Sequence, residues 1–197
     1  DDFREVAKNI AKAGIGIFGY HWMPNVVWRT NRNKIIRGKA IVTEFARNVC
    51  GFKDANSTEF SPTTPYPVIS LLEEQEGISD KGGTMRLGAY PCELIAGSQA
   101  SKSYDTSIVQ ERHRHRWEIN LKYRDELEAK GLVISGMSPD NNLIEMIEIK
   151  DHPYFVASQF HPEFKSRPWE PAPMFKYFIE AASENKNSTK KTIETQK

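Results

Sequence analysis

The sequence is poor in the features that mark secreted, membrane-spanning and strongly basic proteins. It has two cysteines in 197 residues, Cys50 and Cys92, and no secretory signal at its start, so we expect free thiols in a reducing compartment. No apolar run approaches the roughly 20 residues that a membrane span needs. The net charge is +1, which argues against a generally basic nucleic-acid binder. We therefore expect a cytoplasmic protein with no membrane or nucleic-acid partner.

The length suits about one domain with a sizeable core. Helices are expected over residues 1–13, 40–51, 123–130 and 173–182, and strands over residues 68–72, 85–87, 108–112, 132–135, 143–149 and 155–160. This interleaving predicts an α/β layered fold. The polar stretch 184–197 is expected to be disordered. Because the sequence opens on Asp1, we expect a processed protein or a fragment.

The stretch SQFHPEF places His161 two positions before Glu163, directly after an apolar run. A histidine with a pKa near neutrality can take a proton from a nucleophile, and a neighbouring carboxylate can orient and charge the imidazole. The pair therefore indicates half of a catalytic triad. The alternative is that both are ordinary surface residues at the end of a strand.

A second polar motif, ERHRHRWEIN, alternates arginine and histidine. Strand periodicity puts Arg112, Arg114 and Arg116 on one face, and His113 and His115 on the other. Three guanidinium groups on one side can hold a carboxylate or phosphate through forked hydrogen bonds. A solvated, salt-bridged edge strand is the alternative.

Two further stretches contain turn residues. KGGTMRLG supplies glycines and one arginine, and is expected to be a structural turn. ANSTEF offers Asn56 and Ser57 as caps, and it leaves Glu59 available to bind a cationic group. Turn chemistry alone would also explain ANSTEF.

Several motifs, taken together and in order, resemble the C-terminal part of the class I glutaminase domain of CTP synthase. They are EFARNVCGFKDANSTEF, TPYPVISLLEEQ, GGTMRLGAYPCEL, ERHRHRWEIN, LIEMIEIKDHPYFVASQFHPEFKSRP and PAPMFKYFIEAAS. The resemblance covers about residues 44 to 182 and implies an incomplete class I glutamine amidotransferase-like, flavodoxin-like layered domain. It also implies glutamine hydrolysis by cysteine, histidine and glutamate. Ammonia then passes to a separate synthase domain, which aminates ATP-activated UTP to CTP in pyrimidine nucleotide biosynthesis.

The resemblance also implies roles for individual residues. His161 matches the general base and Glu163 its orienting partner, while Glu59 and Arg116 match the groups that hold the amino and carboxylate ends of L-glutamine. An amino acid substrate needs one anion and one cation in fixed positions, which agrees with this set. No cofactor or metal is expected in this chain. ATP and Mg belong to the family's synthase domain, which is absent here.

The nucleophile of the family has no match in this sequence. The family's cysteine lies in an elbow reading like GICLGMQ, whereas this chain has NKIIRGK there, with Ile35 at the cysteine position. Cys50 and Cys92 fall elsewhere and are expected to be buried small apolar residues. The Gly-rich oxyanion-hole loop is also missing. We therefore expect the chain alone not to be catalytically competent.

Residues 1–43 follow a different pattern. AKNIAKAGIGIFGYHWMPNVVWRTN and IRGKAIVT resemble a segment of a mannonate dehydratase, so the likeness changes between Thr43 and Glu44 and predicts a chimera. The expected parts are this foreign helix-strand-loop segment, the glutaminase part over residues 44–183, and the tail. Some forty residues cannot build a (β/α)8 barrel, so dehydratase activity is not expected. A non-catalytic glutamine- or partner-binding module remains the alternative to an enzyme fragment.

Overall fold

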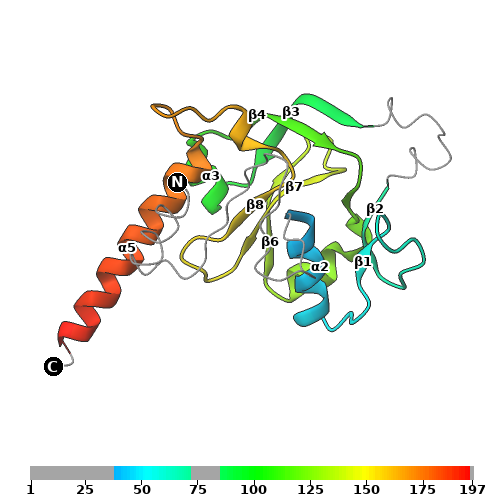
Figure 1. Cartoon of the computed structure of the whole chain (residues 1–197), viewed down its shortest axis with the longest axis horizontal. Coiled ribbons are helices and arrows are strands. Elements are labelled where there is room, and N and C mark those ends of the chain that lie inside the picture. Colours follow the sequence, from blue (N-terminus) through cyan, green and yellow to red (C-terminus); the bar gives the residue numbers. More distant parts are fainter. Residues whose placement is uncertain (1–37, 72–84, 196–197) are drawn as a thin grey trace, which may run out of the picture.

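The computed structural model of the protein describes residues 38–71 and 85–195, with side chains over residues 41–71 and 85–185. Helices are interspersed among groups of strands along the chain (Figure 1). They are α2 (Gly38–Asn48), β1 (Asn56–Ser57), β2 (Pro67–Ser70), β3 (Arg86–Leu94), α3 (Gln99–Tyr104), β4 (Ile108–His115), β5 (Glu118–Ile119), η2 (Leu121–Tyr123), α4 (Arg124–Ala129), β6 (Leu132–Met137), β7 (Ile144–Ile149), β8 (Val156–Ser158), η3 (Pro162–Phe164) and α5 (Pro173–Thr195). Each strand expected from the sequence overlaps one of these elements, as do the expected helices within the described ranges.

A five-stranded sheet in the order β4-β3-β6-β7-β8 forms the centre, and all its pairings are antiparallel. Strand β3 pairs with β4 from Arg86↔His115 to Glu93↔Ile108, but with β6 only at Glu93 and Leu94. The first part of β3 and the facing part of β4 therefore form a two-stranded ribbon that extends past β6. Beside this sheet lies a small one, β1-β2-β5, in which β1 and β2 are parallel.

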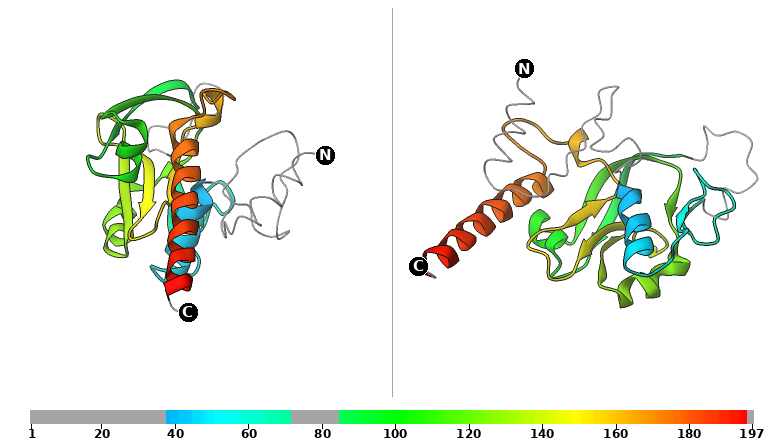
Figure 2. Two further views of the ribbon diagram at one scale, coloured as in Figure 1. Left: turned by 90° about the vertical axis from the view of Figure 1, so that its left-hand side faces the viewer. Right: turned by 60° about the horizontal axis from the view of Figure 1, so that its bottom comes forward.

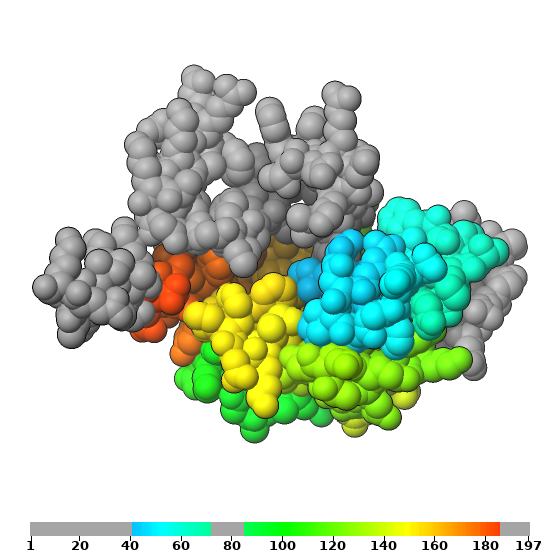
Figure 3. Space-filling view, turned by 90° about the horizontal axis from the view of Figure 1, so that it is seen from below, coloured from blue at the N-terminus to red at the C-terminus, as the bar shows by residue number. Residues whose placement is uncertain are grey.

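Two apolar cores stabilise these layers. The larger one joins α2, the small sheet, α4 and strands β6 and β7; its buried members are Val42, Ala46, Ala55, Val68, Ile69, Ile119, Tyr123, Leu127, Leu132, Ile134, Met137, Ile144 and Ile147. The smaller one joins β3, β4 and β7 to α3 and the start of α5; its buried members are Cys92, Leu94, Ala100, Val109, Met146, Phe160 and Met174. Figure 3 shows α2 at the surface between the small sheet and the β7–β8 segment.

Helix α2 crosses the position at which the sequence likeness changes. It is continuous through Thr43 and Glu44, and Val42 on one side and Ala46 on the other are both fully buried in the larger core. Apolar residues four apart share a helix face, so both sides of the expected junction pack as one element. Within the described ranges no structural boundary falls there. The foreign segment expected over residues 1–43 lies mostly outside the described residues.

Helix α5 is longer than expected. Residues 184–197 were expected to be disordered, but the helix continues to Thr195 and projects away from the sheet (Figure 2). Its first turn is anchored, because Met174 is buried and its carbonyl accepts a 3.2 Å hydrogen bond from the Tyr154 hydroxyl. Extending an existing helix is far less costly than nucleating one, which accounts for the helical continuation. No helix of the described ranges is both long enough and apolar enough to cross a bilayer.

Candidate functional site

His161 and Glu163 lie side by side just after β8, where the chain enters η3. Pro162 follows His161 and begins η3, and a residue before proline is restricted to extended conformations. The short turn then brings Glu163 back to the ring, with Nδ1 of His161 2.7 Å from Oε1 of Glu163. The two side chains are 21% and 25% exposed. The expected adjacency of the pair is therefore confirmed, and both residues are accessible from solvent.

The outer edge of β4 holds this pair in place. The backbone N–H of His161 donates a 2.8 Å hydrogen bond to the carbonyl of Arg112. Nearby, the Nζ of Lys165 donates a 2.7 Å hydrogen bond to the carbonyl of Gln110. Strand β4 lies at the edge of the five-stranded sheet, so its outward carbonyl groups are available for these bonds.

Arg116 does not share a face with Arg112 and Arg114, so that expectation is wrong. Strand β4 ends at His115, and the alternation of faces ends with it; Arg112 and Arg114 are exposed, whereas Arg116 is 8% exposed. Its guanidinium carbon lies 5.7 Å from the centre of the Trp117 ring. Its Nε is buried and has no hydrogen-bond partner among the described residues. A buried guanidinium nitrogen without an acceptor is costly unless a ligand supplies one.

Glu59 lies on an exposed turn after β1. Its N–H donates a 3.2 Å hydrogen bond to the Ser57 hydroxyl, and the N–H of Ser57 donates to the side-chain oxygen of Asn56. These are the turn contacts expected of that stretch. The Glu59 carboxylate forms no ion pair with any residue that the structure describes.

Neither cysteine has the surroundings of a nucleophile. Cys92 in β3 is fully buried, and burial is the main reason that its pKa rises to about 12. Cys50 is half-buried after α2, its Sγ lies 3.9 Å from the carbonyl of Glu126, and burial again raises its pKa. Reactive thiols have lowered pKa values in electropositive surroundings. Both thiols are free, as expected, but the expected burial is confirmed for Cys92 and is wrong for Cys50, which is half-buried. Ile35 lies outside the described residues.

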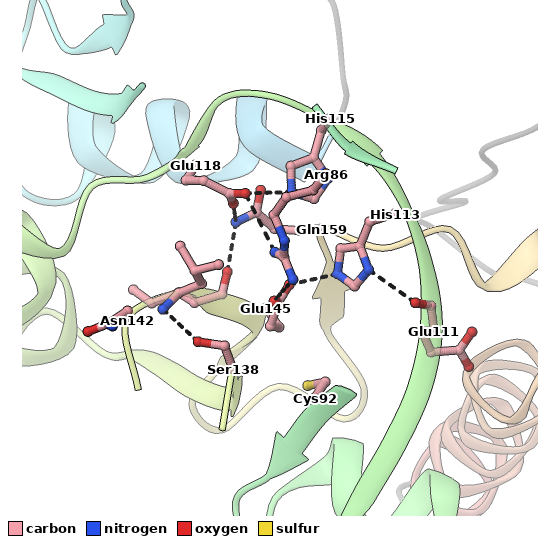
Figure 4. Close-up of polar contacts among 12 residues, drawn as sticks. Arg86, Cys92, Glu111, His113, His115, Glu118, Ser138, Asn142, Glu145 and Gln159 are labelled. Atoms are coloured by element: carbon pink, nitrogen blue, oxygen red, sulfur yellow. Dashed lines mark hydrogen bonds and ion pairs between the residues drawn. The ribbon is translucent and has the colours of Figure 1, made fainter. Parts of the chain in front are cut away.

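A charged cluster, missed in the sequence, fills the space under the β3–β4 ribbon (Figure 4). Arg86 lies between two glutamates, 2.7 Å from Oε1 of Glu145 and 3.5 Å from Oε1 of Glu118. His113 contacts Oε2 of Glu145 at 2.9 Å, and His115 contacts Oε1 of Glu118 at 2.9 Å. We call these five residues the buried charge cluster. The inward histidines of β4 belong to it, which explains their alternation with exposed arginines.

Glu145, a member of this cluster, and Glu111, outside it, have pKa shifts in opposite directions. Burial opposes ionisation of Glu145, but the contacts with His113 and Arg86 outweigh it and hold its pKa below the usual range. Burial raises the pKa of Glu111, and Lys165 at 3.9 Å offsets this only in part. Tyr104 donates a 3.1 Å hydrogen bond to Glu111. The sequence did contain a signal for buried glutamates, since LIEMIEI places Glu145 and Glu148 among apolar residues of one strand.

No group of three or more potential metal ligands occurs in the described ranges. A small hollow lies at β7 and β8, and neither His161 nor Arg116 lines it. It is lined by Ile119, Glu145, Met146, Ile147, Ala157, Ser158 and Gln159.

Comparison with known proteins identifies relatives of this chain. Residues 39–181 match the family model for glutamine amidotransferase class-I. The chain is 64% identical over 140 residues to the CTP synthase of Caldanaerobacter subterraneus subsp. tengcongensis, covering 71% of this chain and 26% of that protein. The CTP synthase of Fibrobacter succinogenes is 56% identical over 160 residues, covering 79% and 28%. The chain thus spans about a quarter of the length of the curated relatives it matches.

A solved structure gives the same result. The glutaminase domain of Trypanosoma brucei CTPS, with bound acivicin, superposes with a TM-score of 0.69 at 36% identity, covering 74% of this chain and 57% of that chain. The α/β fold expected from the sequence is thereby confirmed. The family match begins before the expected junction at residues 43 and 44, and it gives no support to a mannonate dehydratase segment. Since the match extends over well over half of its length, the chain belongs to the class I glutamine amidotransferase family.

Proposed function

We propose that this chain is the glutaminase portion of a CTP synthase. In the whole protein it would hydrolyse L-glutamine and supply ammonia for the ATP-dependent amination of UTP to CTP, which makes the whole protein a ligase. The observation that carries this proposal is the accessible His161–Glu163 pair, with Nδ1 of His161 2.7 Å from the Glu163 carboxylate. In the chemistry proposed, Nε2 of His161 would take the proton of the family's attacking cysteine thiol, which has no match in this sequence, and Glu163 would stabilise the imidazolium that forms.

Arg116 and Glu59 are proposed to bind the two charged ends of glutamine. A guanidinium suits a carboxylate, because it can donate two parallel hydrogen bonds. The buried Nε of Arg116 supports this assignment, because it has no acceptor among the described residues. The exposed Glu59 carboxylate would accept from the substrate ammonium. ATP and Mg would act in the synthase domain and not in this chain.

The chain alone is proposed to be inactive as a glutaminase. The sequence has only Cys50 and Cys92, and burial raises the pKa of both. Loss of the nucleophile from a comparable triad costs on the order of a millionfold in turnover. A coupled ammonia assay tests this: the purified chain should release no ammonia from glutamine above background. Release that disappears in a His161→Ala variant would refute inactivity, and Cys50→Ala would then be tested first.

A non-catalytic glutamine-binding module is the second candidate, and the buried, unsatisfied Arg116 favours it. Titration calorimetry with L-glutamine tests the binding module. A retained binding module must show saturable affinity that falls in an Arg116→Ala variant, with Arg114→Ala as the matched control because Arg114 is exposed. An absence of binding by the folded chain would refute both the binding module and the assignment of Arg116.

A further inference from the structure

Arg116, which is proposed to hold the glutamine carboxylate, and His161, which is proposed to accept a proton, lie on separate segments. Arg116 follows β4, whereas His161 follows β8. One backbone contact joins the segments, from the N–H of His161 to the carbonyl of Arg112. Arg112 is four residues from Arg116, or up to about 13 Å of extended chain, so this contact alone leaves their separation loosely defined.

A side-chain bridge joins the same segments more directly. Gln159 lies two residues before His161, and Glu118 lies two residues after Arg116. The side-chain amide of Gln159 donates a 2.7 Å hydrogen bond to Oε2 of Glu118 (Figure 4). The bond is short and its acceptor is a carboxylate that is 1% exposed, so it belongs to the stronger class of hydrogen bonds.

Both ends of this bridge are fixed. On one side, Glu118 is held by His115 at 2.9 Å and by Arg86 at 3.5 Å. On the other side, the Gln159 amide also donates to the carbonyl of Ile144 at 2.7 Å, and its backbone N–H donates to the carbonyl of Glu145 at 2.8 Å. The bridge therefore connects strands of the central sheet to β5, and it has little freedom to move.

The single residue between the bridge and the histidine is also held. Phe160 is 3% exposed and belongs to the smaller apolar core. Its ring lies edge-on to that of His113, with centroids 5.8 Å apart. A displacement of Gln159 is thus passed to His161 because packing constrains the backbone between them.

We propose that Glu118 and Gln159 are positioning residues, whose hydrogen bond fixes the separation between the carboxylate-binding Arg116 and the proton-accepting His161. Neither is expected to touch substrate. The inference rests on the proposed function for the roles of Arg116 and His161, but the bridge itself is a property of the folded chain. The buried charge cluster would then help to position the site as well as to stabilise the fold, since Arg86 and His115 hold the Glu118 carboxylate.

The test uses NMR of the full chain: one partner of the bridge is substituted, and the signal of the site residue on the other segment is measured. In a Gln159→Leu variant, the Nε–H signal of Arg116 should shift; in a Glu118→Ala variant, the ring signals of His161 should shift. Glu118→Gln keeps an oxygen acceptor for Gln159 and should restore most of the His161 signal. Glu148→Gln is the matched control, because Glu148 is 6% exposed and its carboxylate accepts from the N–H groups of Gln99 and Ala100 instead.

L-Glutamine affinity provides the second readout. Gln159→Leu should weaken binding about 10-fold, a size that coupling through packed networks reaches, while Glu148→Gln should leave it unchanged. Gln159→Asn, whose amide is too short for the bridge, replaces the leucine variant if that variant does not fold. Unchanged Arg116 and His161 signals in folded variants would overturn the inference. Wild-type chain that binds no glutamine would instead refute the proposed role of Arg116 in glutamine binding, and the NMR comparison would still decide on the bridge.

Discussion

Among the histidine–glutamate contacts of the described residues, the His161–Glu163 and His113–Glu145 pairs have nearly equal lengths but opposite surroundings. In one, Nδ1 of His161 is 2.7 Å from Glu163, and the side chains are 21% and 25% exposed. In the other, Nε2 of His113 is 2.9 Å from Glu145, and both side chains are fully buried. The first pair lies on a turn that follows an edge of the sheet, and the second lies between strands β4 and β7.

The difference shows that a short imidazole–carboxylate distance does not by itself mark a catalytic pair. Both ring nitrogens of His113 are engaged, because Nδ1 lies 3.1 Å from the carbonyl of Glu111 and Nε2 contacts Glu145. Arg86 adds a cation on the other side of Glu145. A pair enclosed in this way cannot reach a substrate, so its consequences are for stability. Only the exposed pair is suited to proton transfer with a bound molecule.

Truncating one carboxylate in each pair should give the largest contrast. Glu145→Ala removes the buried carboxylate that Arg86 and His113 share, and breaking a buried pair in this way costs about 3–5 kcal/mol of unfolding free energy. Glu163→Ala removes a partly exposed partner and should cost below about 1 kcal/mol. Urea unfolding of both variants measures the difference. Equal losses would contradict the view that the two pairs have different roles.

A smaller effect is expected from neutralising Glu145 without removing its shape. Glu145→Gln should lower the unfolding free energy by about 1–3 kcal/mol at pH 7, because a buried charge-assisted contact is lost. The pKa of Glu145 is lowered in the folded state, so its stabilisation is full above the unfolded value of 4.5 and is lost as pH falls through the folded pKa. The difference between wild type and variant should therefore shrink in acid. If the difference in unfolding free energy grew below pH 4.5, the pKa of Glu145 could not be lowered in the folded state.

The smallest effect, of opposite sign, is expected at Glu111. Its pKa is raised in the folded state, mainly by burial, so its contribution to stability is greatest below the unfolded value of 4.5 and is lost as pH rises toward the folded pKa. Glu111→Gln, which does not titrate, should thus gain stability relative to wild type as pH rises from 4 to 7. Measured together in urea titrations, the Glu111→Gln and Glu145→Gln differences should slope in opposite directions. Parallel slopes would show that burial does not govern Glu111.

Much of the fold could be predicted from the sequence because apolar spacing dominates it. The expected strands reappear as β2, β3, β4, β6, β7 and β8, and the expected pairing of His161 with Glu163 is observed. The proline after His161 restricts the backbone of that residue, which favours this local geometry. The glutamine-binding roles of Glu59 and Arg116 stay predictions.

The parts that could not be predicted depend on long-range packing. Periodicity alone placed Arg116 with the exposed arginines, but a strand ends where its neighbour ends, and β4 stops one residue earlier. The buried charge cluster combines residues from four strands, which no local pattern brings together. The tail was expected to be disordered from its polarity, whereas helix α5 continues because its first turn is anchored.

The attachment of His161 to β4 has a consequence for the solution behaviour of the chain. Strand β4 is an edge of the five-stranded sheet, and such edges can pair with a strand of another molecule and start aggregation. The N–H of His161 and the Nζ of Lys165 occupy the outward carbonyls of Arg112 and Gln110. The segment that carries the proposed general base thus also shields this edge from intermolecular strand addition, so loosening it should increase self-association.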